Sequence, residues 1–235
     1  MSFIFSSAKI KGIKCTDNPT PITGGNLKLP LIYDEITDTG YYGIVSSSEL
    51  FTGTELSTSL GLTDGVLHND DVEWLHFYVG KDAACNRDEH NRPYAIYIAK
   101  KTIRHTISWD HIDGVGAVTG TEVSSKVGKN YICRVPTGAD SDPSTTATTN
   151  KSEWNALMYR IHTEVPAGQV GTNWESFNDT ETNITVGNGK YSWCQEHYND
   201  TARVLRGYHS TVAFNINTLS GVNYGFRPCL ISFTA

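Results

Sequence analysis

Short apolar segments separated by turn-forming residues make up most of this sequence. The apolar stretches "LKLPLIY" (27–33) and "YYGIVSSSELF" (41–51) lie next to "TDNPTPITGG" (16–25) and "TDTG" (37–40). Proline presets the backbone angle φ that turns require, and glycine supplies positive φ, so the polar stretches predict turns. Short strands joined by such turns indicate a β-rich fold.

The composition agrees with a β-rich chain and limits the classes of partner that we expect it to bind. Apolar residues make up 38% of the chain and charged residues 19%, with 21 glycines and 12 tyrosines. The formal net charge is −6 and no basic stripe is visible, so nucleic acid is not an expected partner. No apolar run reaches the roughly 18 residues of a membrane helix, so no membrane insertion is expected.

The five cysteines are scattered along the chain, at Cys15, Cys85, Cys133, Cys194 and Cys229. No two of them form a C-x-x-C pair. We therefore expect reduced thiols in the core. A zinc site assembled from distant ligands is the less favoured alternative.

Residues 72–235 carry the clearer secondary-structure signals. "VEWLHFYVG" (72–80) and "AIYIAKKTI" (95–103) predict two strands that pair as a hairpin. Ser108 predicts the N-cap of a short helix. A second helix is predicted over 152–164, where apolar residues recur at helical spacing after Ser152.

Further strands are expected at residues 130–138, 183–196, 203–209 and 224–233. The expected fold class is α+β and β-rich, with two short helices. We divide the chain into an N-terminal β/loop extension (1–71), which would attach the protein to a larger particle, and a main domain (72–235).

Five motifs in this order resemble a domain at the C-termini of tailed-bacteriophage virion proteins: "YIAKKTIRHTISWDHI", "WNALMYRIH", "YSWCQE", "RVLRGYH" and "YGFRPCLI". That domain typically ends in a Gly-aromatic-Arg-Pro-Val-Leu pattern, and here Cys229 stands in place of the valine. The last two motifs are also similar to the final strands of the C-type-lectin-like fold. The resemblance covers residues 72–235 and implies a C-type-lectin-like domain.

The resemblance implies two paired core strands, which carry Arg203, Arg206 and Gly207, and Gly225, Phe226 and Arg227. Residues 210–222 would then form a long surface connection. We expect the three arginines to be structural, binding carboxylates such as Glu196 and backbone carbonyls. An anion-binding cluster is the less favoured alternative. The glycines would let strands turn or approach closely.

Exposed loops are expected to carry ligand-binding residues: Trp174, Tyr208, His209, Asn215, Asn217, Asn223 and Tyr224. Tyrosine and asparagine give contact area and adaptable hydrogen bonds, and an exposed tryptophan stacks on sugar rings or anchors protein contacts. The oxygen-rich stretches 174–182 and 197–201 suit calcium, but they suit tight turns equally well. We favour turns and expect no metal or other cofactor.

No histidine or serine lies in a catalytic frame such as H-E-x-x-H or G-x-S-x-G, so no enzymatic activity is expected. Together with the resemblance, this predicts a virion component, made in the bacterial cytoplasm and displayed on the exterior of a tailed phage as head decoration, collar, tail or baseplate. Its expected partners are other virion proteins, further copies of itself, and a host-surface glycan or protein. The alternative is a phage-borne enzyme acting on cell-wall or capsule polysaccharide, with Glu175 and Glu196 as acid and base.

Overall fold

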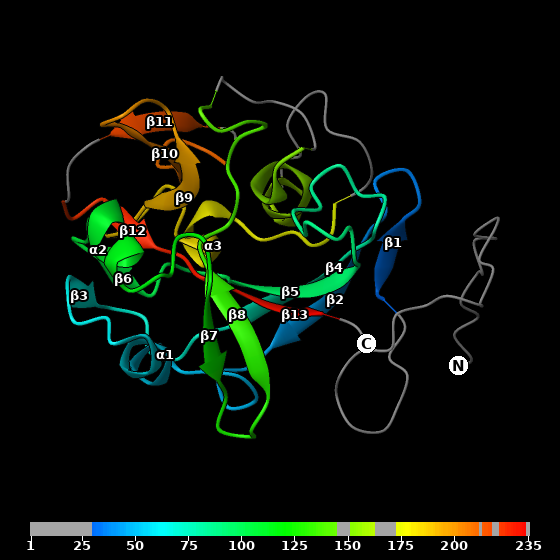
Figure 1. The fold of residues 1–235 in the computed structure, drawn as a ribbon, viewed down its shortest axis with the longest axis horizontal. Coiled ribbons are helices and arrows are strands. Elements are labelled where there is room, and N and C mark those ends of the chain that lie inside the picture. The colour runs from blue at the N-terminus through cyan, green and yellow to red at the C-terminus, as the bar shows by residue number, and fades with distance from the viewer. Residues whose placement is uncertain (1–29, 145–150, 163–172, 212, 218–220, 234–235) are drawn as a thin grey trace, which may run out of the picture.

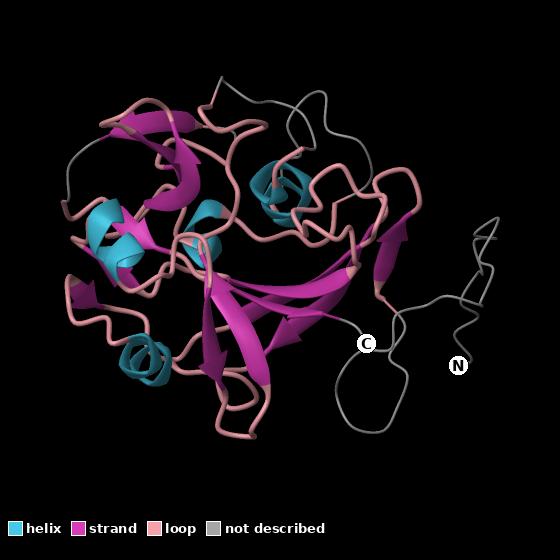
Figure 2. Cartoon of the chain, viewed as in Figure 1, coloured by secondary structure: helices cyan, strands magenta, loops and turns pink. Residues whose placement is uncertain are grey.

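The computed structural model describes residues 30–144, 151–162, 173–211, 213–217 and 221–233. These residues form a mixed α+β, strand-rich fold with two sheets (Figures 1 and 2). Sheet A is antiparallel, in the order β1 (Ile32–Asp34), β2 (Thr39–Val45), β4 (Trp74–Val79), β5 (Tyr94–Ala99), β13 (Cys229–Phe233), β8 (Asn130–Arg134) and β7 (Thr121–Ser124). Sheet B has the order β11 (Phe214–Asn217), β10 (Arg203–Gly207), β9 (Tyr191–His197), β12 (Tyr224–Phe226), β6 (Arg104–His105) and β3 (Val66–Leu67).

Sheet A is buried on both faces because its central strands are apolar on both sides. β4 and β5 pair from Trp74↔Ala99 to Val79↔Tyr94, which confirms the predicted hairpin. Phe77 belongs to a hydrophobic cluster that also contains the helical segment after residue 153. Trp74 belongs to a second cluster, which sheet B shares. The sheet is thus the middle layer of the molecule.

In sheet B, the two closing motifs are arranged differently from the expectation. β10 and β12 are not paired with each other, because β9 lies between them, antiparallel to β10 and parallel to β12. β11 lies within the expected surface connection at 210–222 and pairs with β10. The prediction of an extended loop is therefore wrong for residues 214–217. These residues alternate, so that Phe214 packs on a small buried cluster while the asparagines face away from it.

Residues 30–71 of the described chain share the sheet and the core of the rest. β2 pairs with β4 across the expected boundary at residue 71, and α1 (Gly53–Leu60) places Leu56 in the main core. This helix was not expected from the sequence. Thr52 and Glu55 form a capping box, in which each side chain accepts a hydrogen bond from the backbone N–H of the other.

The predicted helices are present, with one change of type. Ser108 caps α2 (Trp109–Gly114) by accepting a hydrogen bond from His111 N, as expected. The helix predicted over 152–164 is, up to residue 161, a π-helix, η1 (Trp154–Met158), followed by a 3₁₀ turn, η2 (Tyr159–Ile161), and residues 163–164 lie outside the described residues. With α1 and α3 (Asp179–Thr182), the described chain has more helices than the two expected.

The segment from η1 to η2 is enclosed by the rest of the molecule and is not a surface helix. Its polar residues Asn155 and Arg160, and Glu153 at its N-cap, are as buried as its apolar ones. Arg160, for example, forms an ion pair with Asp34 at 3.1 Å. Polar side chains buried in this way need partners, and such partners cannot be read from helical periodicity.

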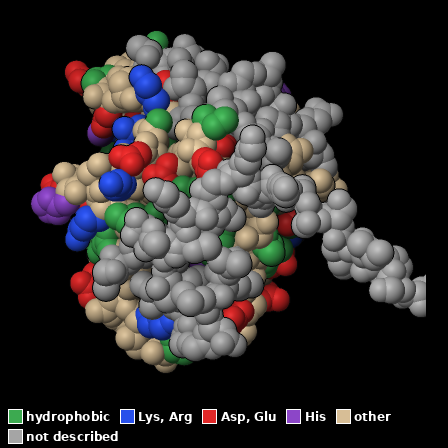
Figure 3. All heavy atoms as spheres, turned by 90° about the vertical axis from the view of Figure 1, so that its right-hand side faces the viewer, with side chains coloured by type: hydrophobic (Ala, Val, Ile, Leu, Met, Phe, Trp, Pro, Cys, Tyr) green, Lys and Arg blue, Asp and Glu red, His purple; other side chains and the backbone are tan. Residues whose placement is uncertain are grey.

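Sheet B and the ends of the described chain lie on different sides of the molecule. In Figure 1, β1 and the end of β13 lie on the right, whereas β9, β10, β11 and β12 lie on the left. Figure 3 views the right-hand side, where the described side chains are mixed: acidic and basic groups are interspersed with small hydrophobic patches. Sheet B is therefore remote from the ends of the described chain.

Candidate functional site

Three tyrosines stack on one another at one end of sheet B. The rings of Tyr208 and Tyr191 are 4.5 Å apart and nearly parallel, at 8°. The ring of Tyr224 also stacks on the ring of Tyr191, with the ring centres 5.5 Å apart and the ring planes at 20°. Such offset pairs add about 0.5–1.5 kcal/mol each to the stability gained by burial. We call these three residues the tyrosine stack.

Strand pairing brings the tyrosine stack together from three separate segments. Tyr191 begins β9, and Tyr224 begins β12 directly beside it in parallel register. Gly207 at the end of β10 pairs with Tyr191, so the next residue, Tyr208, leaves the strand over that ring. Tyr208 has a positive φ of 79°, which is uncommon for a bulky residue. Backbone outliers of this kind concentrate at functional positions.

Two asparagines of β11 bind the hydroxyl groups of the tyrosine stack. The Asn215 amide donates to the Tyr191 hydroxyl at 2.6 Å, and the Asn217 amide donates to the Tyr224 hydroxyl. Burial raises the pKa of Tyr224, and the neighbouring Tyr191 and Tyr208 add to this shift. The Tyr224 hydroxyl therefore stays neutral at physiological pH and can both donate and accept hydrogen bonds.

Basic side chains flank the tyrosine stack. The Lys190 ammonium lies 4.4 Å from the centre of the Tyr208 ring, and the exposed His209 ring meets the same ring edge-on at 4.5 Å. Tyr208 and Tyr224 are themselves partly exposed. The face therefore presents aromatic rings, amides and cations together, a combination that suits saccharide or protein ligands.

Five of the seven predicted ligand-binding residues meet at this site: Tyr208, His209, Asn215, Asn217 and Tyr224. Asn223 adjoins it, and its backbone carbonyl accepts a hydrogen bond from Tyr191 N at 2.7 Å. Sequence reasoning missed Tyr191 and Lys190, which were assigned to a strand. The alternation of Tyr191 and Trp193 along that strand was the available signal.

Trp174 was expected to be exposed, and this prediction is wrong. Its side chain is buried in the cluster beneath sheet A. The guanidinium of the buried Arg160 lies 3.4 Å from the centre of its ring, and Tyr41 lies on the same indole. The polar sequence around Trp174 concealed this role, because its partner Arg160 comes from another element.

Arg206 and Arg227 are buried structural residues, as predicted, but their partners differ in part from the expectation. Arg206 donates to the Gly138 carbonyl at 2.9 Å, to the Asn155 side chain and to the Tyr159 hydroxyl. No carboxylate of the described chain forms an ion pair with either arginine. The expected carboxylate partners are therefore replaced by neutral oxygens.

Arg203 departs from the structural prediction. It is only partly buried, with its guanidinium 4.5 Å from the centre of the Trp109 ring. On the neighbouring strand β11, Arg203 pairs with Asn217, whose amide binds the Tyr224 hydroxyl. Arg203 therefore lies on the same face of sheet B as the tyrosine stack. Because its side chain reaches the surface, Arg203 is a candidate for ligand contact.

The predicted roles of the two glycines are confirmed. Gly207 has a φ of 96°, and a Cβ there would lie 2.5 Å from the Lys190 carbonyl oxygen. A Cβ on Gly225 would lie 2.8 Å from the Thr102 side chain. Both positions allow a close approach that only glycine permits.

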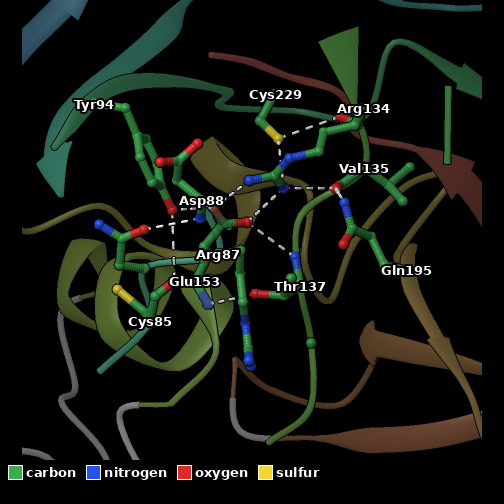
Figure 4. Close-up of polar contacts among 12 residues, drawn as sticks. Cys85, Arg87, Asp88, Tyr94, Arg134, Val135, Thr137, Glu153, Gln195 and Cys229 are labelled. Atoms are coloured by element: carbon green, nitrogen blue, oxygen red, sulfur yellow. Dashed lines mark hydrogen bonds and ion pairs between the residues drawn. The ribbon is translucent and has the colours of Figure 1, made fainter. Parts of the chain in front are cut away.

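A polar network of charged and neutral side chains surrounds Glu153 (Figure 4). Arg134 donates to the Glu153 carboxylate at 2.7 Å, and Tyr94 and the Thr137 backbone donate to the same group. Burial alone would raise the pKa of Glu153, but Arg134 and the hydrogen bonds hold it below its ordinary value. These four residues are buried, and their network joins sheet A to the start of η1.

The two carboxylates considered for an enzyme face different partners. Glu196 is buried, and its carboxylate accepts a hydrogen bond from Gly138 N at 2.9 Å. Burial raises the pKa of Glu196 to about 7. Glu175 instead faces the Tyr41 hydroxyl on β2 and helps to raise the pKa of that tyrosine, which burial raises most. No contact in the described chain joins the two carboxylates.

The stretches considered for calcium form caps and turns. Asn178 caps α3, and Asn199 accepts hydrogen bonds from the backbone of Thr201 and Ala202. Among the described residues, no group of three or more His, Cys, Asp or Glu side chains is placed to hold a metal ion. Within the same residues, no helix combines the length and apolarity needed to cross a membrane.

Comparison of the chain with protein-family models, with curated proteins and with solved structures finds no match.

Proposed function

We propose that this protein is a non-enzymatic component of the exterior of a tailed-phage particle, and that it binds a host-surface ligand through the tyrosine stack. The ordered phage-like motifs motivate the particle, and the tyrosine stack is the observation that carries the binding role. In this proposal the domain is C-type-lectin-like, residues 1–71 include the attachment region, and several copies assemble in the virion.

The chemistry of the face supports a binding role. Partly exposed tyrosines supply large rigid contact area at low conformational cost, and asparagine amides supply adaptable hydrogen bonds. The location of the face also supports it. Because sheet B is remote from the ends of the described chain, attachment near those ends would leave the tyrosine stack free to meet a host surface.

Presence in the particle is tested by mass spectrometry of purified virions. We expect peptides of this protein at a stoichiometry consistent with a symmetric virion component. Virions that contain no copies would refute the structural role.

Binding is tested with the recombinant protein on host cells. We expect it to bind the cells and to reduce adsorption of the phage. Tyr208→Ala should weaken binding about fivefold or more, in line with the loss of one aromatic contact. Tyr198→Ala is the matched control, because Tyr198 is an exposed tyrosine outside the tyrosine stack. Equal effects of both variants, or no binding by the unaltered protein, would refute the binding role.

A further inference from the structure

Two cations on the face of the tyrosine stack lack an acidic partner. Within the described residues, no carboxylate lies at ion-pair distance from Arg203 or Lys190, whereas Lys100, Arg134 and Arg160 each have one. Both unpaired cations instead lie over aromatic rings, those of Trp109 and Tyr208. In a chain with a net charge of −6, cations without a carboxylate partner are available to pair with an anionic ligand.

The hydrogen bonds of Arg203 leave part of its guanidinium available. Within the described chain, its hydrogen bonds are all donated by Nη1, to the carbonyls of Asn199, Asp200 and Ala202 at 3.3–3.4 Å. These bonds are long for a charged donor, which normally binds at 2.7–2.9 Å. An anionic group could bind more strongly than these carbonyls do.

The two cations bracket the tyrosine stack. Arg203 begins β10 opposite Asn217, whose amide binds the Tyr224 hydroxyl at one end of the tyrosine stack. Lys190 lies at the other end, over Tyr208. Arg203 and Gly207, the two ends of β10, are four residues apart in sequence, roughly 13 Å at the usual rise per residue. A ligand lying along the tyrosine stack would therefore meet a cation at each end.

We infer that the ligand of this face is an anionic saccharide, whose acidic groups pair with Arg203 and Lys190 while its rings and hydroxyl groups contact the tyrosines and asparagines. The inference rests on the proposed binding role and specifies its ligand class. Guanidinium and ammonium groups bind carboxylate and phosphate groups through charge-assisted hydrogen bonds, so they select for saccharides with such substituents. A neutral saccharide would leave both cations unpaired.

The test uses two probes from the envelope of the host: the acidic and the neutral polysaccharide fractions, separated by anion exchange. We expect the acidic fraction to bind, with an affinity that falls as salt is raised. Arg203→Gln and Lys190→Gln should each weaken this binding about tenfold, the effect of losing one charge-assisted hydrogen bond. Lys81→Gln, at an exposed lysine elsewhere, is the matched control.

Two further measurements make the result decisive. Thermal unfolding of each variant separates loss of fold from loss of binding. Lys190 and Arg203 lie on different segments of the chain, so the inference does not depend on one substitution. In the second measurement, the acidic substituents of the bound fraction are removed, by carboxyl reduction in one arm and by phosphatase treatment in another. The treatment that abolishes binding identifies whether the protein binds carboxylate or phosphate groups.

Binding of the neutral fraction alone would overturn the inference and leave the binding role intact. So would binding of the acidic fraction that neither Gln variant weakens, or binding to whole cells with neither fraction bound. Absence of any binding to host cells would overturn the binding role itself.

Discussion

Arg227 connects four segments of the chain through a single buried guanidinium. It donates to the Ser192 hydroxyl at 2.9 Å, to the carbonyls of Ala99 and Lys100, and to the Thr182 carbonyl at 2.6 Å. Burial lowers the pKa of Arg227 to about 9. Arg227→Ala would leave these acceptors unpaired in the interior, so we expect a loss of about 3 kcal/mol in the free energy of unfolding, measured by urea denaturation.

The asparagines of β11 provide the comparison for Arg227. Asn215 and Asn217 each make a hydrogen bond to a tyrosine hydroxyl at a partly exposed position. Asn215→Ala and Asn217→Ala should therefore cost less than about 1 kcal/mol and act mainly on binding. Equal losses for all three variants would show that the Arg227 network contributes no more than a surface contact.

Glu196 makes the stability of the fold depend on pH. Its folded-state pKa of about 7 lies above the ordinary value, so the folded protein holds this proton more tightly than the unfolded chain. The resulting stabilisation is fully present below the unfolded-state pKa and is lost as the pH rises through about 7. Glu196→Gln keeps an acceptor for Gly138 N and removes the charge. We expect the variant to exceed the unaltered protein in stability at pH 8, by a few kcal/mol at most.

Urea unfolding at pH 5 and pH 8 checks this expectation. Only the unaltered protein should lose stability between the two values through this residue, so the difference between the proteins should be small at pH 5 and should favour the variant at pH 8. A constant difference at both pH values would show that the buried carboxyl titrates normally.

Side-chain roles were predictable where the sequence supplied the neighbours. The closing motifs indicated that Arg206 and Arg227 are structural, and both are buried. The sequence could not show that Arg160 lies against Trp174, because the two residues are brought together by packing and not by spacing. Arg203 shares a motif with Arg206 but is only partly buried, because it is the first residue of β10, whereas the residues that follow it are buried on both sides of the strand.

The end of β10 depends on a glycine. Gly207 combines positive φ with a close approach to the Lys190 carbonyl, and Tyr208 follows it into the tyrosine stack. Gly207→Ala should destabilise the fold by several kcal/mol and weaken ligand binding. Gly61→Ala, at a C-cap with positive φ but open space around its Cα, should cost only about 1 kcal/mol.

Thermal denaturation of the two glycine variants separates crowding from backbone strain. Both substitutions place alanine at positive φ, and only Gly207 also faces a clash. Similar shifts in melting temperature would indicate that the chain near Gly207 relaxes to accommodate the methyl group.

Elements were predictable where their signal was local. The hairpin of β4 and β5 and the cap of α2 follow from adjacent residues, and both are confirmed. α1 was missed because its capping box lies in a stretch rich in serine and threonine, where turns are equally favoured. The insertion of β9 between β10 and β12 joins distant segments, and strand order of that kind leaves no mark in periodicity.

The four cysteines of the described chain report on the integrity of the whole molecule. Cys85, Cys133, Cys194 and Cys229 are free and buried, and burial raises the pKa of each thiol, to about 12 for Cys85 and Cys229. Since the thiolate is the reactive form, we expect none of the four to be alkylated by iodoacetamide in the native protein. Cys15 lies outside the described residues, so we make no prediction for its labelling.

Peptide mass spectrometry after labelling, with and without urea, checks this expectation. All four cysteines should become labelled together as the protein unfolds, because each lies in one of the three hydrophobic clusters packed on the two sheets. Labelling of one of them at a rate independent of urea would reveal local opening of its part of the fold.

The positions of β12 and β13 within the sheets affect when the chain can fold during its synthesis. β13 lies between β5 and β8 in sheet A, and β12 lies between β9 and β6 in sheet B. A nascent chain that ends before Tyr224 thus lacks an inner strand of both sheets and leaves the apolar edge of β5 unpaired. Neither sheet can close until residues 224–233 have left the ribosome, so we expect the pairing of β5 with β8 through β13 to form only after this segment emerges.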